Sequence, residues 1–157
     1  MNRALSALVV LALAGCGGGG PLELVSTEPP GDAVDTGARQ GGTGPSSDER
    51  VFELPAPEGG DLSYEVTVRN TSSGTVTVTD VVHDEERDGP FVPEEVEGAP
   101  VEIEAGATAP VTVSGHIEAC RFGGQQVALA GPELEFEDGE SQQFDLGKRV
   151  ELETERC

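Results

Sequence analysis

The densest cluster of chemistry-bearing side chains in the sequence is an acidic run over residues 80–89. Its candidate ligands are Asp80, Asp84, Glu85 and Asp88. Calcium takes six to eight hard oxygen ligands, and closely spaced carboxylates on a loop that ends in glycine can supply them. The order does not match the Asp-x-Asp-x-Asp-Gly calcium pattern, and Arg87 lies in its middle. The run therefore predicts either a divalent-cation site or a solvated acidic loop.

Two histidines, His83 and His116, suggest a second kind of metal site. His116 lies four residues before Cys120, and His83 would have to join it from another hairpin. A copper site favours methionine or further histidines, which the sequence does not offer here. His116 also falls on the polar face of its predicted strand, so we interpret it as a surface histidine, with metal ligation as the alternative.

Catalytic motifs do not stand out in the sequence. It contains no Gly-x-Ser-x-Gly elbow, no His-Glu-x-x-His pair and no phosphate-binding glycine loop ahead of a predicted helix. Paired carboxylates are abundant, but in so acidic a composition they carry no information. The sequence therefore predicts a protein that is not an enzyme and that has no cofactor.

The N-terminal residues indicate export and anchoring. Arg3 precedes an uncharged apolar run that is too short to span a bilayer as a helix. The run ends in Leu13-Ala14-Gly15-Cys16, which resembles the lipobox of bacterial lipoproteins. The resemblance implies a signal peptide over residues 1–15, cleavage before Cys16, and a lipid on its thiol. A protein of this kind is attached to the outer face of the cell membrane or to an envelope membrane.

Two cysteines remain once Cys16 carries a lipid. Cys120 and Cys157 form an even pair in an exported domain, which favours a disulfide over metal thiolates or a redox pair. Closing a loop of 37 residues stabilises the fold by about 4 kcal/mol in the chain-entropy model. The predicted bond would also hold the C-terminal strand in place.

The charge of the chain excludes two classes of partner. Thirty acidic and nine basic residues give a formal net charge of −21. This field repels a phosphate backbone and anionic lipid headgroups alike. We therefore expect no nucleic-acid partner and a membrane attachment that is covalent.

Residues 16–49 read as a tether that carries the lipidated cysteine. Glycine- and proline-rich segments without a helical or strand period predict disorder, with a reach of about 30 Å. The short apolar piece at residues 22–25 is the exception and suits an edge strand. The folded domain is expected over residues 50–157.

The domain shows a period of two in its apolar residues. Leu62, Tyr64, Val66 and Val68 alternate with polar residues, and a second strand follows over residues 75–82. We expect these two strands to pair as a hairpin across the turn at residues 70–74. Similar alternation continues to the C-terminus and predicts an all-β, antiparallel sandwich of about seven strands.

Two segments resemble bacterial immunoglobulin-like extracellular domains. In residues 64–78 a strand ends in an Asn-Thr turn and is followed by a valine- and threonine-rich strand. Residues 103–113 are similar to the later turn of those domains, with Ala105-Gly106 where Pro-Gly is usual. The resemblance implies an immunoglobulin-like sandwich and no particular function. We expect an envelope lipoprotein that binds another protein or a surface polymer, with calcium binding by the 80–89 loop as the alternative.

Overall fold

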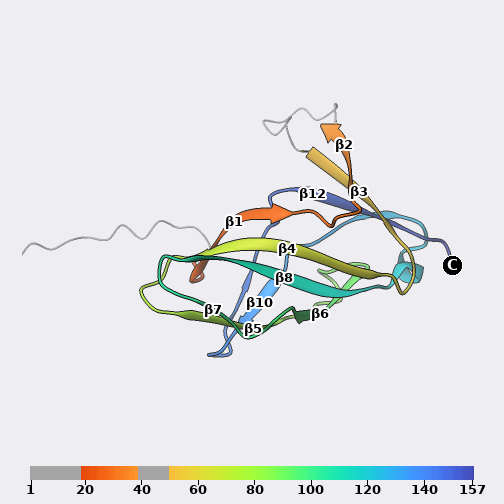
Figure 1. The fold of residues 1–157 in the computed structure, drawn as a ribbon. Helices are drawn as coiled ribbons and strands as arrows, with labels where there is room; N and C mark the ends of the chain where they lie inside the picture. Colours follow the sequence, from red (N-terminus) through yellow and green to blue (C-terminus); the bar gives the residue numbers. More distant parts are fainter. Residues whose placement is uncertain (1–18, 39–49) are drawn as a thin grey trace, which may run out of the picture.

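The computed structural model describes residues 19–38 and 50–157. Cys16, the predicted signal peptide and residues 39–49 lie outside the described residues. The described chain is all-β, as the sequence predicts, with one short 3₁₀ helix, η1, at Ala119–Phe122. Its strands form three four-stranded sheets (Figure 1). None of the described residues forms a helix long and apolar enough to cross a bilayer.

The first two sheets form the body of the domain. The first sheet consists, in spatial order, of β1 (Leu22–Glu28), β4 (Asp61–Asn70), β8 (Thr108–Ile117) and β6 (Phe91–Val96). The second sheet consists of β11 (Ser141–Gln143), β10 (Glu133–Phe136), β5 (Val76–Val81) and β7 (Val101–Ile103). All of their pairings are antiparallel. Valine and leucine side chains from both sheets join one buried cluster.

The third sheet contains the only parallel pairing in the described residues. It consists of β2 (Val34–Ala38), β3 (Arg50–Ala56), β12 (Arg149–Thr154) and β9 (Gln126–Ala128). β12 pairs with β3 in parallel from Arg149↔Val51 to Thr154↔Ala56. The strands β4–β11 lie between them in the sequence, so no tight turn joins β3 to β12 and requires an antiparallel direction.

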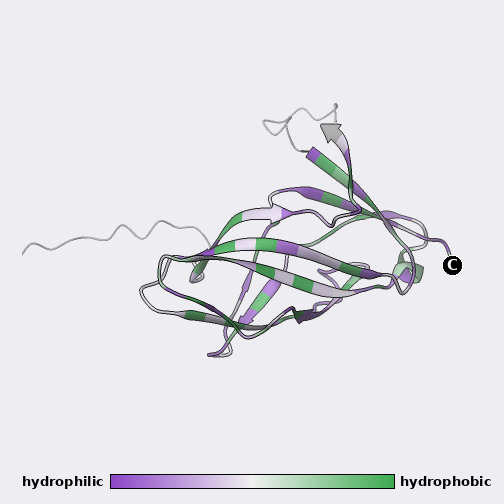
Figure 2. Cartoon of the chain, in the orientation of Figure 1, coloured by the Kyte–Doolittle hydropathy of each residue, from purple (hydrophilic) through white to green (hydrophobic). Residues whose placement is uncertain are grey.

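Alternating burial explains why the strands form where the sequence predicts them. In β4 the side chains of Leu62, Tyr64, Val66 and Val68 are buried, and those between them are more exposed. β8 follows the same rule. Figure 2 shows the resulting bands of apolar and polar residues along both strands. Each strand buries one face against the core, which is the arrangement that a period of two predicts.

The number of strands and one predicted pairing are wrong. The described residues contain twelve strands in three sheets rather than about seven in two. β4 and β5 do not form a hairpin, because β4 pairs with β1 and β8 whereas β5 pairs with β7 and β10. Residues 71–75 therefore carry the chain from one sheet to the other. The alternation predicted both strands correctly, but it cannot distinguish a hairpin from a crossover between sheets.

The assignment of residues 16–49 to a tether is also corrected within the described residues 19–38, because these contain β1 and β2. Leu22 is only 4% exposed and belongs to the main core cluster. β1 pairs with β4 at the edge of the first sheet, so residues 22–25 do begin an edge strand, as their composition suggested. The flanking glycines and prolines obscured the rest of the strand, which is stabilised by partners far along the chain.

Candidate functional site

The acidic loop between β5 and β6 is organised around the buried carboxylate of Asp88. This residue is 4% exposed. Its Oδ2 accepts a hydrogen bond from the Asp84 backbone N–H at 2.7 Å and lies 3.1 Å from His83 Nδ1. Its Oδ1 accepts a hydrogen bond from Arg87 Nε at 2.7 Å. Asp88 is thus surrounded by donors from its own loop, as a buried carboxylate requires.

Arg87 links this loop to the second sheet. Its Nη1 is paired with Glu133 on β10, and its Nη2 donates to the Val82 carbonyl at 2.8 Å. Ser141 on β11 donates to the other oxygen of Glu133. Burial alone would lower the pKa of Arg87, but its hydrogen bonds to Asp88 and Glu133 outweigh burial and raise it. The hydrogen bonds among Arg87, Asp88 and Glu133 fix the conformation of the loop. Sequence reasoning missed them because Glu133 lies 46 residues after Arg87.

The other candidate calcium ligands are directed to different partners. Asp84 Oδ1 accepts the backbone N–H groups of Glu86 at 2.9 Å and Arg87 at 3.1 Å, and these bonds lower its pKa. Asp80 Oδ1 accepts the N–H of Val81 at 2.8 Å. Glu85 pairs instead with Arg121 of η1 at 3.6 Å.

No three of the predicted calcium ligands converge in the part of the chain that the structure describes. There, the one group of three metal-ligand atoms within reach of one another belongs to Glu58, Cys120 and Cys157. The two sulfurs in that group are bonded to each other. Calcium binding by Asp80, Asp84, Glu85 and Asp88 stays a prediction to which this geometry adds nothing.

Both histidines contact carboxylates at the same end of the sandwich. His116 Nδ1 lies 3.0 Å from Glu94 Oε1 on the neighbouring β6, and its Nε2 lies 3.9 Å from Glu118 Oε1. The side chains of His83 and His116 are 32% and 34% exposed. They are therefore partly exposed residues whose rings lie beside carboxylates, which agrees with the interpretation of His116 as a surface histidine.

A disulfide joins Cys120 and Cys157, as the sequence analysis predicted, with a Cα–Cα distance of 5.3 Å. The Cys120 backbone N–H also donates to Glu58 Oε2 at 2.7 Å. The bond connects η1 to the segment after β12 and so ties the third sheet to the end of β8. Its location matches the expected role of holding the C-terminal strand.

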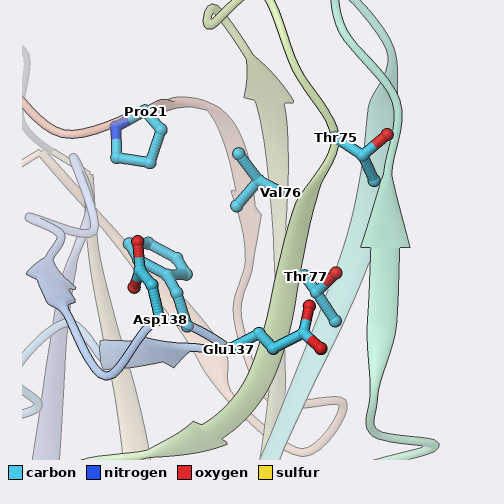
Figure 3. Close-up of a pocket in the computed structure, with 7 residues that line it drawn as sticks. Pro21, Thr75, Val76, Thr77, Glu137 and Asp138 are labelled. Atoms are coloured by element: carbon cyan, nitrogen blue, oxygen red, sulfur yellow. The ribbon is translucent and has the colours of Figure 1, made fainter.

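A pocket lies at the end of the sandwich where β1 begins (Figure 3). Its volume is about 340 Å³. Apolar atoms of Pro21, Val76 and Phe136 line it, together with the acidic residues Glu137 and Asp138. The Asp138 carboxylate also accepts the Glu140 N–H at 2.9 Å, so it caps the turn between β10 and β11.

A second pocket, here called the proline pocket, lies where β3 ends and β4 begins. Its volume is about 420 Å³. The turn between β1 and β2 contributes one wall, and the end of β8 contributes Ile117. Its lining combines proline rings and leucine side chains with two aspartates: Pro30, Asp32, Leu54, Pro55, Pro57, Asp61 and Leu62. Sequence reasoning missed it because its walls come from separate segments of the chain, and residues 30–32 were assigned to the tether.

No protein-family model matches this chain, and no curated protein matches it. Among solved structures, the chain is similar to the VesB protease of Vibrio cholerae, with 20% sequence identity and a TM-score of 0.37. The match covers 66% of this chain and 30% of the VesB chain. It is also similar to the secreted serine protease VesC from Vibrio cholerae, with 11% identity and a TM-score of 0.34 over 64% of this chain and 21% of that one. The matches thus span less than a third of either protease.

The comparison corrects one prediction. The sequence analysis expected that the protein is not an enzyme, whereas both of these similar structures are proteases. We therefore withdraw that prediction. TM-scores of 0.37 and 0.34 carry no argument about activity, so the likeness does not assign proteolysis to this chain either.

Proposed function

We propose that the protein is a lipoprotein of the cell envelope whose immunoglobulin-like β-sandwich binds another protein or a surface polymer. One observation carries the anchoring part of this proposal. It is the motif Leu13-Ala14-Gly15-Cys16 directly after a short apolar run that follows Arg3. Two or three acyl chains on Cys16 exceed the marginal membrane affinity of a single chain, so the attachment would be stable.

Two further properties support an extracytoplasmic location. The Cys120–Cys157 disulfide suits an oxidising compartment. The net charge of −21 disfavours docking on anionic headgroups, so a covalent lipid is the better explanation for membrane attachment. The same charge favours a partner surface that is basic over one that is acidic.

The arrangement of the first two sheets supports the immunoglobulin-like part of the proposal. The chain crosses between these two sheets at every connection from β4 to β8, and both sheets contribute to one core. In sandwiches of this kind the loops and pockets at the two ends are the usual contact surfaces. The third sheet adds Leu54, Val150 and Leu152 to the same core.

The anchoring part is tested by Cys16→Ser in the native host. We expect wild-type protein to partition into the detergent phase of a Triton X-114 extract and to carry a mass increase equal to its acyl chains. The variant should stay uncleaved or move to the aqueous phase. Equal partitioning of both proteins at equal mature mass would refute the lipid anchor.

The binding part is tested by photo-cross-linking on intact cells. A photoreactive residue at Ser63, beside the proline pocket, is compared with one at Ser73, in the turn near the start of β1. Specific adducts from one position only, suppressed by excess unlabelled protein, would support partner binding. Adduct patterns that are identical at both positions would contradict a defined contact surface.

A further inference from the structure

The correction of the tether determines which end of the sandwich faces the membrane, provided that Cys16 carries a lipid as proposed above. Only residues 17–21 separate Cys16 from Leu22, the first residue of β1. Six Cα–Cα steps span at most about 20 Å. The start of β1, and with it the pocket of Figure 3, therefore lies close to the bilayer surface.

The proline pocket lies at the opposite end of the first sheet. β4 contains ten residues and runs from Asp61, which pairs with His116, to Asn70, which pairs with Leu22. At about 3.3 Å per residue these ends are about 30 Å apart. Figure 1 shows the start of β1 at one end of β4 and η1 at the other. The proline pocket thus lies about 30 Å from the tethered end of the first sheet, where a partner can approach.

The lining of the proline pocket combines apolar walls with negative charge. Leu54, Leu62 and Ile117 form a buried floor, and the rings of Pro55 and Pro57 are exposed beside it. Two exposed carboxylates, Asp32 and Asp61, complete the rim. Among the described residues neither carboxylate has an ion pair or a side-chain hydrogen bond, in contrast to Asp84 and Asp88.

We propose that the proline pocket binds an arginine side chain of a partner protein. The methylene groups and planar guanidinium of arginine pack well on proline rings and apolar floors. The guanidinium can donate hydrogen bonds to Asp32 and Asp61, which gives each carboxylate the partner that it lacks. A volume of about 420 Å³ lies within the range of ligand pockets and accommodates the side chain with its flanking backbone.

Charge complementarity selects this occupant. Every partner approaches a chain of net charge −21, so a cationic group gains from the overall field as well as from the two rim carboxylates. The pocket of Figure 3 has a similar pair of acidic residues, Glu137 and Asp138, but lies beside Pro21 at the membrane-facing end. That pair provides a matched control with the same change in charge.

The experiment is an NMR titration of the mature chain carrying Cys16→Ser, which leaves every described residue in place. The probe is acetyl-arginine methylamide, and acetyl-citrulline methylamide is its neutral isostere. We expect the arginine probe to shift the amide signals of Gly31, Gly60 and Ser63, and the citrulline probe to leave them unchanged. Asp32→Asn combined with Asp61→Asn should weaken binding about fivefold, from two exposed ion pairs.

The control is Glu137→Gln combined with Asp138→Asn, which should leave the affinity unchanged. Equal weakening by both double variants would overturn the proposal, because it would show a response to net charge alone. Equal shifts with the citrulline probe, or shifts confined to residues outside the proline pocket, would overturn it as well. Failure of the lipid anchor is seen separately, in the Triton X-114 partitioning, so the two results are distinguishable.

Discussion

The side chain of Asn70 stabilises residues 71–75, which connect the first sheet to the second where a hairpin turn was predicted. This side chain is fully buried. Its Nδ2 donates to the carbonyls of Gly74 at 2.7 Å and Ile103 at 2.8 Å. Its Oδ1 accepts the backbone N–H of Ser72 at 2.9 Å and the Ser72 hydroxyl at 2.7 Å. One side chain therefore joins the end of β4 to β7 in the opposite sheet.

We expect Asn70→Ala to destabilise the fold by about 4–6 kcal/mol. Three partly buried bonds within the turn contribute about 1 kcal/mol each, and the buried Ile103 carbonyl would lose its bond to Nδ2 at a cost of about 1–3 kcal/mol. Total stabilities of domains are about 5–15 kcal/mol, so this loss is a large share. Asn70→Asp removes both donors without creating a cavity and places a charge there, so its effect should be at least as large.

The measurement is urea denaturation followed by far-ultraviolet circular dichroism, since the chain has no tryptophan. Thr71→Ala is the control, because the Thr71 hydroxyl makes one exposed bond to the Pro21 carbonyl and its loss should cost about 0.5 kcal/mol or less. A loss below about 1 kcal/mol for Asn70→Ala would refute the reasoning. It would mean that the surrounding strands position β7 without this side chain.

Three further outcomes are expected. Replacing Cys120 and Cys157 together by alanine should lower the free energy of unfolding by about 4 kcal/mol for a loop of 37 residues; an unchanged urea midpoint would contradict this. Burial raises the pKa of Tyr64, and the charge of Asp88 raises it further. The folded state therefore favours the neutral phenol, and the stability that this contributes below about pH 10 is lost as the pH rises above the ordinary tyrosine pKa. Because Tyr64 is the single tyrosine, tyrosinate absorbance should appear together with unfolding; tyrosinate formation in the folded protein at about pH 10 would argue against its burial. Backbone hydrogen bonds lower the pKa of Asp84, so the ionised carboxylate stabilises the folded state. The loss of stability caused by Asp84→Ala should therefore be present at neutral pH and fade as the pH falls below the ordinary aspartate range. A stability difference between variant and wild type that does not change with pH would contradict a contribution from these hydrogen bonds.

Local patterns in the sequence predicted several of the strands and one covalent bond. The alternation of Leu62, Tyr64, Val66 and Val68 produces the buried face of β4. The even cysteine pair led to the prediction of a disulfide, because the resemblance to a lipobox implies export and thiols are oxidised in compartments outside the cytosol. The lipobox resemblance at Cys16 is likewise a local motif, and it lies outside the described residues.

The candidate site could be predicted only in part. The carboxylates of residues 80–89 were recognised as a group, but their partners were not, because Glu133 and Arg121 come from distant elements. Asp88 was predicted as a calcium ligand, but its buried carboxylate accepts hydrogen bonds from Arg87 and the Asp84 backbone N–H. The proline pocket had no local signal, since its walls come from three separate segments of the chain.

By itself, therefore, the sequence determined the strand character of strongly alternating segments such as β4, β5 and β8, the net charge and the pairing of two cysteines. Side-chain alternation, ionisation and thiol oxidation depend on residue type and near neighbours. Only the tertiary structure decided which sheet each strand joins, and it separated β4 from β5 and paired β12 with β3 in parallel. It also made β1 part of the core, so that the fold begins within about 20 Å of Cys16. Strand pairing is a contact between distant residues, and a period of two is the same whichever partner lies beside the strand.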